Sequence, residues 1–197
     1  MAELTVRQTA IPGLLVLDLP VHGDSRGWFK ENWQRAKMIE LGLPDFGPVQ
    51  NNMSFNATAG STRGLHAEPW DKLVSLASGR ILGAWVDLRP GESFGTPFTL
   101  EMGTDQAVFV PRGVANGYQA LADDTTYSYL VNDHWSPRAL DSYSYVNLAD
   151  PTVGVRWPIP LEDAIVSNAD RRHPPLAAAK PVPLLRTVNL LQMSASL

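Results

Sequence analysis

Short hydrophobic runs separated by turn residues dominate the chain between residues 50 and 160. The segment KLVSLASGRILGAWVDLRPGESFG (72–95) contains two β-rich runs, which are split by Ser-Gly-Arg and ended by Arg-Pro-Gly. Residues 96–121 continue this pattern, and TTYSYLVNDHW (125–135) adds a strand of alternating aromatic side chains. Strands that recur about every 8–12 residues are typical of sandwiches and barrels. The pattern therefore predicts an all-β fold.

Helical patterns are scarce, because 16 prolines and 15 glycines interrupt the chain. The best helical segment is ENWQRAKMIELGL (31–43), which Gly42 is expected to end. The residues expected to share one face of this helix are Trp33, Ala36, Met38 and Ile39.

The length of 197 residues predicts a single domain, 1–197, that can bury about 70% of the surface of its unfolded chain. No internal repeat or linker is evident. From about residue 175 the chain becomes proline-rich and then apolar, which predicts a C-terminal tail. We expect this tail to cover the body or a partner subunit and to end in a short helix; a partly disordered terminus is the alternative.

Charge and composition exclude several classes of protein. The net charge of −4 gives no reason to expect nucleic-acid binding, and the absence of cysteine excludes disulfides and thiolate chemistry. The first apolar run has no basic segment before it and is broken by Pro12 and Asp18, so neither a signal peptide nor a membrane span is predicted. A cytoplasmic protein is the resulting expectation.

The motifs of several common enzyme classes are missing. There is no glycine-rich dinucleotide or P-loop signature and no Gly-x-Ser-x-Gly elbow. Metal sites typically need about three or four converging ligands. No two histidines are paired at a metal-binding spacing, so no metal is predicted; the four are His22, His66, His134 and His173.

Proton transfer is the chemistry that remains. His66, in STRGLHAEPWDKLV (61–74), is the natural candidate, because histidine titrates nearest neutral pH. A structural histidine beside a strand is the alternative reading, and Lys72 alone could be a solvated surface residue. Tyr127 and Tyr129 alternate on one strand and must face the same side, where they could simply line the core.

An ordered set of motifs resembles the dTDP-4-dehydrorhamnose 3,5-epimerase family, over nearly the whole chain except about the last twenty residues. One such piece would be a weak signal, but the ordered set is specific. The matching pieces are DSRGWFKE (24–31), QNNMS (50–54), RGLH (63–66), KLV (72–74), VDLRPGESFG (86–95), VFVPRGVANGY (108–118), YSYLV (127–131), ADPTVGVRWP (149–158) and SNAD (167–170).

The resemblance implies a cupin-type jelly roll with a few short helices and a role for each matching position. His66 resembles the general base, and Asp170 its carboxylate partner. Lys72 resembles the cation beside the C4 oxygen of the sugar, and Tyr129 the acid on the opposite face. The positions that resemble substrate-binding residues are Arg26, Phe29, Glu31, Gln50, Asn52, Arg63, Asn116 and Trp135.

The chain departs from the family pattern at two places. The segment between His66 and Lys72 is shorter than in many members, and Glu68, Trp70 and Asp71 within it are expected to shape the turn without chemistry. Asn116 stands where the family has a histidine, so the role of that histidine is not carried over.

The function implied is a metal-independent and cofactor-independent inversion of C3 and C5 of dTDP-4-dehydro-6-deoxy-D-glucose, in dTDP-L-rhamnose synthesis. The resemblance also implies a homodimer with exchanged N-terminal strands. Three alternatives stay open: an epimerase of one carbon on another nucleotide 4-keto sugar, a non-catalytic sugar-binding cupin, and a metal-dependent cupin.

Overall fold

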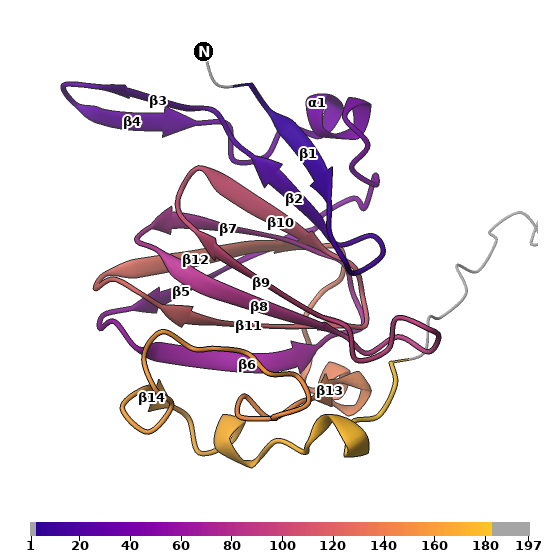
Figure 1. The fold of residues 1–197 in the computed structure, drawn as a ribbon. Coiled ribbons are helices and arrows are strands. Elements are labelled where there is room, and N and C mark those ends of the chain that lie inside the picture. Colours follow the sequence, from indigo (N-terminus) through magenta and orange to yellow (C-terminus); the bar gives the residue numbers. More distant parts are fainter. Residues whose placement is uncertain (1–2, 183–197) are drawn as a thin grey trace, which may run out of the picture.

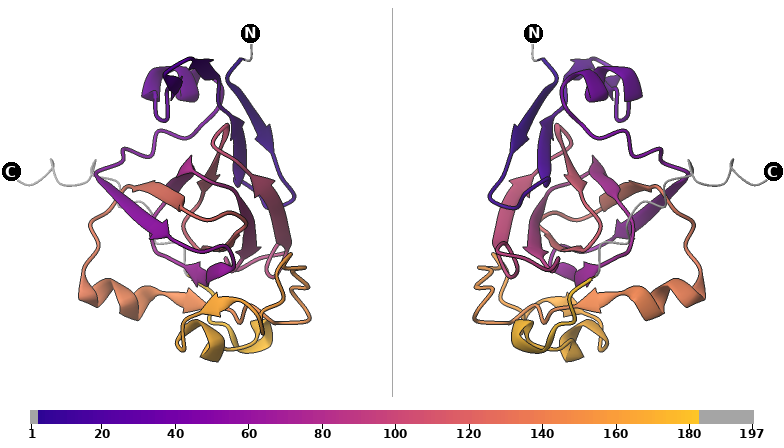
Figure 2. Two further views of the ribbon diagram at one scale, coloured as in Figure 1. Left: turned by 90° about the vertical axis from the view of Figure 1, so that its left-hand side faces the viewer. Right: turned by 90° about the vertical axis from the view of Figure 1, so that its right-hand side faces the viewer.

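Two facing β-sheets form the body of the protein in a computed structural model that describes residues 3–182 (Figures 1 and 2). The first, antiparallel sheet contains, in spatial order, β1 (Thr5–Gln8), β2 (Leu15–Asp18), β10 (Gln106–Val110), β7 (Lys72–Ser78), β12 (Thr125–Val131) and β5 (Gln50–Asn56). The second contains β13 (Ser144–Tyr145), β6 (Ser61–Ala67), β11 (Val114–Ala120), β8 (Ile81–Asp87) and β9 (Pro97–Met102), and β14 (Ile165–Val166) pairs with β6 in parallel. The predicted all-β sandwich is confirmed.

Three hydrophobic clusters hold these layers together. Between the sheets, Val74 from β7 shares one buried cluster with Trp85 from β8 and Tyr118 from β11. The outer face of the first sheet is covered by the segment around α1 (Arg35–Glu40), where Met38 and Phe46 pack in one cluster with strand residues. Burial of this apolar surface is the main stabilising contribution to the sandwich.

Among residues 3–182 the single α-helix, α1, is shorter than the periodic segment that predicts it. Met38 is fully buried, Trp33 and Ile39 are half-buried, and Ala36 is exposed. Ala36 was therefore wrongly assigned to the apolar face, because the helix touches the sheet along one narrow line. Gly42 ends the helix as predicted, with a positive φ of 100°.

The C-terminal segment covers the outer face of the second sheet, below β6 in Figure 1. It contains the short 3-10 helices η2 (Asp170–Arg172) and η3 (Leu176–Ala178), after the earlier η1 (Pro137–Ser142). Leu176, Ala179 and Val182 are buried in the cluster that β6 and β8 share. The described beginning of the expected tail thus packs on the body, and the remainder, 183–197, lies outside the described residues.

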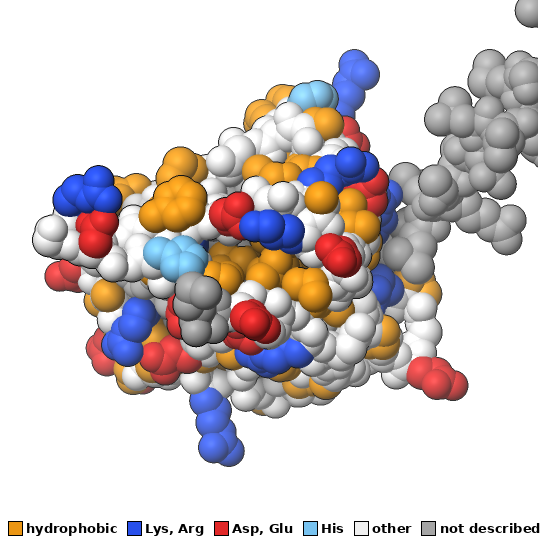
Figure 3. All heavy atoms as spheres, turned by 90° about the horizontal axis from the view of Figure 1, so that it is seen from above, with side chains coloured by type: hydrophobic (Ala, Val, Ile, Leu, Met, Phe, Trp, Pro, Cys, Tyr) orange, Lys and Arg blue, Asp and Glu red, His pale blue; other side chains and the backbone are white. Residues whose placement is uncertain are grey.

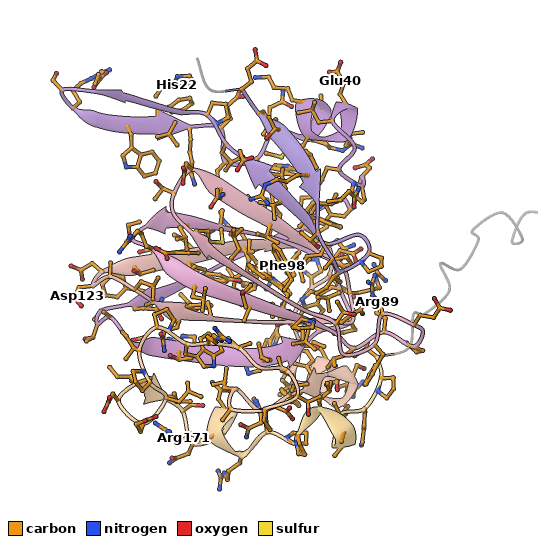
Figure 4. All side chains as sticks on the ribbon, in the orientation of Figure 1. His22, Glu40, Arg89, Phe98, Asp123 and Arg171 are labelled. Atoms are coloured by element: carbon orange, nitrogen blue, oxygen red, sulfur yellow. The ribbon has the colours of Figure 1, made fainter. Side chains whose placement is uncertain are left out.

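A separate hairpin, β3 (Val21–Asp24) and β4 (Gly27–Lys30), projects beyond the sheets (Figure 1). Its base is fastened to the body by the Lys30 ammonium, which donates to the carbonyl oxygens of Leu76 and Thr104 at 2.8 and 2.7 Å. Figure 3 shows hydrophobic side chains among charged ones on this side of the molecule, and Figure 4 places His22 on the hairpin, outside the sheets that contain Phe98. We refer to residues 21–30 as the arm.

The pairing of β6 with β11 is irregular, and this irregularity positions the site. His66 pairs with Asn116 and Arg63 pairs with Tyr118, so β6 has one residue more than β11 in this interval. Such a bulge changes which face later side chains point to. Arg63 and His66, three positions apart, therefore lie on the same face, whereas a regular strand would point them to opposite faces.

The bulge depends on two glycines that bring the strands very close. A Cβ built on Gly117 would lie 2.6 Å from the carbonyl oxygen of Arg63 and 2.9 Å from the Cδ2 atom of Leu65. A Cβ built on Gly64 would lie 2.5 Å from the Cα atom of Gly117. No other residue type fits at either position without a backbone shift.

In residues 3–182 there is no helix long and apolar enough to cross a membrane.

We predict that Gly117→Ala lowers the free energy of unfolding by about 1–3 kcal/mol, the usual cost of forcing extra atoms into a packed interior. Urea denaturation followed by circular dichroism measures it. Gly23→Ala is the control, because its new Cβ would lie 3.6 Å from the nearest atom. Equal stability of the two variants would contradict the close approach.

Candidate active site

A cavity of about 180 Å³ opens between the two sheets. Its second-sheet wall contains Arg63 and His66 from β6 and Asn116 from β11, and its first-sheet wall contains Lys72 from β7 and Tyr129 from β12. Three residues predicted from the sequence to carry out chemistry, His66, Lys72 and Tyr129, thus line one cavity. His66 and Tyr129 belong to opposite sheets.

His66 and Asp170 form a hydrogen-bonded pair although 104 positions separate them. Asp170 lies on η2, is 7% exposed, and places Oδ1 2.9 Å from Nε2 of His66. Burial alone would raise the pKa of Asp170, but the hydrogen bond to His66 and the nearby imidazoles hold that pKa below its usual value. The ionised carboxylate can only accept, so Nε2 carries the proton and Nδ1 of His66 keeps a free electron pair.

His173 adjoins this pair and was missed as a site residue by the sequence reasoning. Its Nδ1 lies 3.2 Å from the carbonyl oxygen of Gly64, its Nε2 lies 3.7 Å from Oδ1 of Asp170, and its ring stacks on Tyr145 at 4.6 Å. Burial, and then the charge of His66, lower the pKa of His173, which keeps the ring neutral. The only available signal was its position three residues after Asp170, directly after the short helix η2.

The atoms of His66, Asp170 and His173 also have the spacing of a metal site. One ligand atom from each lies within 4.8 Å of the others. Sequence spacing could not have revealed this cluster, since His66 lies 104 positions before Asp170. The same atoms are accounted for by the His66–Asp170 hydrogen bond, so the cluster also fits an arrangement that holds a base.

Lys72 is not the solvated lysine that its sequence alone allowed. Its side chain is 3% exposed, its ammonium lies 3.0 Å from Oε2 of Glu68, and it donates to Oδ1 of Asn116. The other end of the Asn116 amide donates to the hydroxyl of Tyr127 at 3.0 Å. A chain of polar contacts therefore crosses from one sheet to the other at the base of the cavity.

The two alternating tyrosines of β12 face the same side, as predicted. The ring centroids of Tyr127 and Tyr129 are 5.8 Å apart, and Tyr127 also stacks on Tyr118 at 4.2 Å. Tyr127 is buried, whereas Tyr129 is half-buried and reaches the cavity. Burial, and then the negative charge of Glu68, raise the pKa of Tyr129 to about 12, so this phenol keeps its proton at neutral pH.

A second cavity, of about 260 Å³, shares Glu68 and Tyr129 with the first. Gln50, Asn52 and Trp135 line it, as the sequence predicted for a binding region. Nε2 of Gln50 donates to Oδ1 of Asn52 at 2.8 Å, and Oε1 of Gln50 accepts from the backbone N–H of Trp135 at 3.2 Å. The Trp135 side chain is half exposed, which leaves its ring face available for stacking.

The predicted binding residues of the arm, Arg26 and Phe29, and Glu31, which follows the arm, do not reach this site within the chain. Arg26 is paired with Asp24 at the tip of the arm, Glu31 pairs with Lys37 at 2.5 Å, and Phe29 is 66% exposed. Two other cavities, which share no lining residue with those between the sheets, contain these residues. The structure therefore separates them from His66, Lys72 and Tyr129.

The arrangement in the cavity suits proton transfer at a carbon next to a carbonyl group. It offers a lone pair on one wall, and a protonated phenol and a buried ammonium on the other. These are a base, an acid and a stabiliser of developing negative charge. Arg63, whose Nε lies 3.3 Å from Oδ1 of Asn56, adds a forked cation that suits a phosphate group.

Comparison with known proteins gives consistent relatives over most of the chain. Residues 8–178 match the family model described as dTDP-4-dehydrorhamnose 3,5-epimerase. A protein RmlC homolog of Streptococcus pyogenes is 51% identical, over 87% of this chain and 89% of the relative. A dTDP-4-dehydrorhamnose 3,5-epimerase of Methanothermobacter thermautotrophicus is 33% identical, over 89% of this chain and 96% of the relative.

A solved structure has the same fold. RmlC from Streptococcus suis in complex with dTDP-D-xylose superposes with a TM-score of 0.88 at 51% sequence identity. The match covers 92% of this chain and 96% of that chain.

Proposed function

The chain belongs to the dTDP-4-dehydrorhamnose 3,5-epimerase family, and on this premise we propose that it inverts C3 and C5 of dTDP-4-dehydro-6-deoxy-D-glucose. The product, dTDP-4-dehydro-L-rhamnose, belongs to the synthesis of dTDP-L-rhamnose for cell-surface polysaccharide. The observation that carries the proposal is the placement of His66 and Tyr129 on opposite sheets around one cavity, with Lys72 on the same wall as Tyr129.

The reaction requires this arrangement because both carbons flank the C4 ketone. Removal of either proton leaves an enolate whose negative charge resides on the C4 oxygen. Delivery of a proton to the opposite face then inverts the carbon, whereas return to the same face restores the substrate. A base and an acid on opposite walls therefore distinguish epimerisation from simple exchange.

His66 is the base in this proposal, and it acts through Nδ1. The hydrogen bond from Nε2 to Asp170 fixes the tautomer that leaves Nδ1 unprotonated, and the carboxylate stabilises the imidazolium once the proton has been taken. General-base catalysis of this kind is worth about 10²–10⁴-fold in rate.

Lys72 and Tyr129 complete the step. The buried ammonium of Lys72 stabilises the enolate oxygen, an effect of about 3 kcal/mol for a well-placed donor. Tyr129 then donates its proton from the opposite sheet. Nothing in this sequence of steps calls for a cofactor, and the proposal includes none.

The nucleotide occupies the second cavity and its rim in this proposal. Arg63 binds the diphosphate, Gln50 and Asn52 contact the diphosphate and sugar, and the exposed ring of Trp135 stacks near the base. Asn116 contributes indirectly, because its amide holds the Lys72 ammonium at the cavity.

Arg26, Phe29 and Glu31 bind the nucleotide of a partner subunit in this proposal. Their exposure and their separation from the cavity of their own chain support an arm that reaches across a homodimer. Strand β1 pairs with β2, and β2 pairs with β10, in the chain's own sheet. Exchange of the N-terminal strands therefore stays a prediction. The segment whose shape supports contact with a partner subunit is the arm.

The second candidate function is inversion at one carbon only, which the same residues could perform. Labelling at both carbons distinguishes the two activities. A non-catalytic sugar-binding protein would show no labelling at all.

We predict that incubation with the 4-keto nucleotide sugar in D₂O containing EDTA places deuterium at both C3 and C5, as measured by NMR. His66→Ala is expected to abolish the labelling while dTDP still binds, because only the base is lost. Wild-type protein that incorporates no deuterium would refute the function. Labelling at C3 alone would identify a single-carbon epimerase, and loss of labelling on chelation would indicate a metal.

Replacement of Tyr129 by Phe is expected to slow product formation more than deuterium exchange, by about 10²-fold or more. The reason is that His66 can still remove and return a proton on its own face. The ratio of the two rates, measured in one reaction by NMR, gives the result. Normal product formation by Tyr129→Phe would place the acid elsewhere.

Mixing two inactive variants tests the arm. In a heterodimer of Arg26→Ala with His66→Ala, an arm that acts across the interface leaves one site with both native residues. We therefore predict that mixed and refolded subunits regain activity that neither homodimer has. An arm that acts within its own chain would leave every site defective, and the mixture would stay inactive.

A further inference from the structure

Glu68 occupies the junction of the two cavities, although its sequence position suggested a turn residue only. It follows the last residue of β6 and its side chain is 12% exposed. Oε2 of Glu68 lies 3.0 Å from the Lys72 ammonium and also accepts the indole N–H of Trp70. Trp70 is itself 4% exposed, so the side chain that holds the Glu68 carboxylate is buried.

This contact determines where the Lys72 ammonium points. An ammonium has three donors, and Glu68 and Asn116 engage two of them. The third remains for a substrate oxygen. A buried cation without a compensating carboxylate is strongly destabilised, and Glu68 supplies that carboxylate to Lys72 at 3.0 Å.

The same carboxylate acts on the tyrosines around the cavity. After burial, the charge of Glu68 is the largest cause that raises the pKa of Tyr129, Tyr143 and Tyr145. An ammonium beside a phenol favours the phenolate, and a carboxylate beside both opposes that effect. Glu68 therefore allows a cation and a neutral phenol to coexist in one small cavity.

We propose that Glu68 is a positioning residue that aims the Lys72 ammonium at the substrate oxygen and places a compensating negative charge beside Tyr129, the acid, with which it lines both cavities. The proposal rests on the function proposed above for this cavity. Its chemical content is a balance of charge: one carboxylate offsets one ammonium next to the phenol that must deliver a proton.

The other groups around Tyr129 are accounted for. Tyr118 lies across the cavity from it and raises its pKa, whereas the positive charge of Arg63 lowers it. Tyr127 is a ring neighbour at 5.8 Å. Among these and Glu68, the only carboxylate is Glu68, so its removal leaves Arg63 and Lys72 as the charged groups at the phenol.

The decisive measurement is the titration of Tyr129 in Glu68→Gln, which keeps the size and an acceptor oxygen but removes the charge. Tyrosine labelled with ¹³C at Cζ is followed by NMR between about pH 9 and 12.5, and Tyr129→Phe assigns the signal. We expect the Tyr129 titration to move about one pH unit lower. Glu101→Gln is the matched control, since Glu101 is an exposed partner of Arg80 on β9.

The kinetic measurement separates positioning from binding. For Glu68→Gln we expect kcat to fall by roughly ten- to a hundredfold with KM nearly unchanged, because the ammonium is misplaced while the nucleotide contacts remain. Glu68→Asp keeps the charge, so its Tyr129 signal is expected to titrate as in the wild type although kcat falls.

Two results would overturn the proposal: an unshifted Tyr129 titration in Glu68→Gln, or a wild-type kcat in that variant. The titration needs no substrate, so it decides on Glu68 even if the wild-type protein fails to epimerise the 4-keto sugar. That failure would refute the proposed function separately.

Discussion

The whole site depends on the irregular pairing between β6 and β11. One extra residue on β6 brings Arg63 and His66 to the same face, and the contact of Gly64 with Gly117 makes room for that extra residue. A regular ladder would send one of the two side chains into the cluster on the outer face of the sheet. The base and the anion-binding cation of the proposed mechanism are thus both positioned by one β-bulge. The two rigid sheets hold this bulge in place.

The second requirement is electrostatic. The interior between the sheets is hydrophobic at one part and strongly polar at another, and Lys72 is buried at the boundary. Two of the polar groups there have a carboxylate partner: Lys72 has Glu68, and His66 has Asp170. Such pairing costs desolvation and contributes little stability, but it orients groups that a solvent-filled cavity would leave mobile. The site is therefore preorganised before any substrate arrives.

The sequence predicted most of the fold, because strand period and turn residues are local signals. The break at Ser-Gly-Arg separates β7 from β8, and alternation placed Tyr127 and Tyr129 on one side. The period of two failed at Arg63 and His66, since a bulge is a property of two strands and not of one.

The sequence predicted the site less evenly. Asp170 was identified only through the family resemblance, because no local pattern connects it with His66. Glu68 and His173 were missed as site residues, since the first resembles a turn residue and the second lies in an irregular segment. Their partners become neighbours only after folding. The predicted apolar face of the helix was wrong at Ala36, which is exposed. The face that the helix buries is narrower than the hydrophobic period predicts.

The C-terminal segment has a consequence for the biosynthesis of the protein. Ribosomes deliver the N-terminal part first, and all twelve strands from β1 to β12 precede Asp170 in the chain. The sandwich can close around His66 while the carboxylate that orients it has yet to be translated. Competence for proton transfer is then acquired last, when η2 docks beside β6. A chain released early, or clipped before this segment, would lack the carboxylate that orients its base.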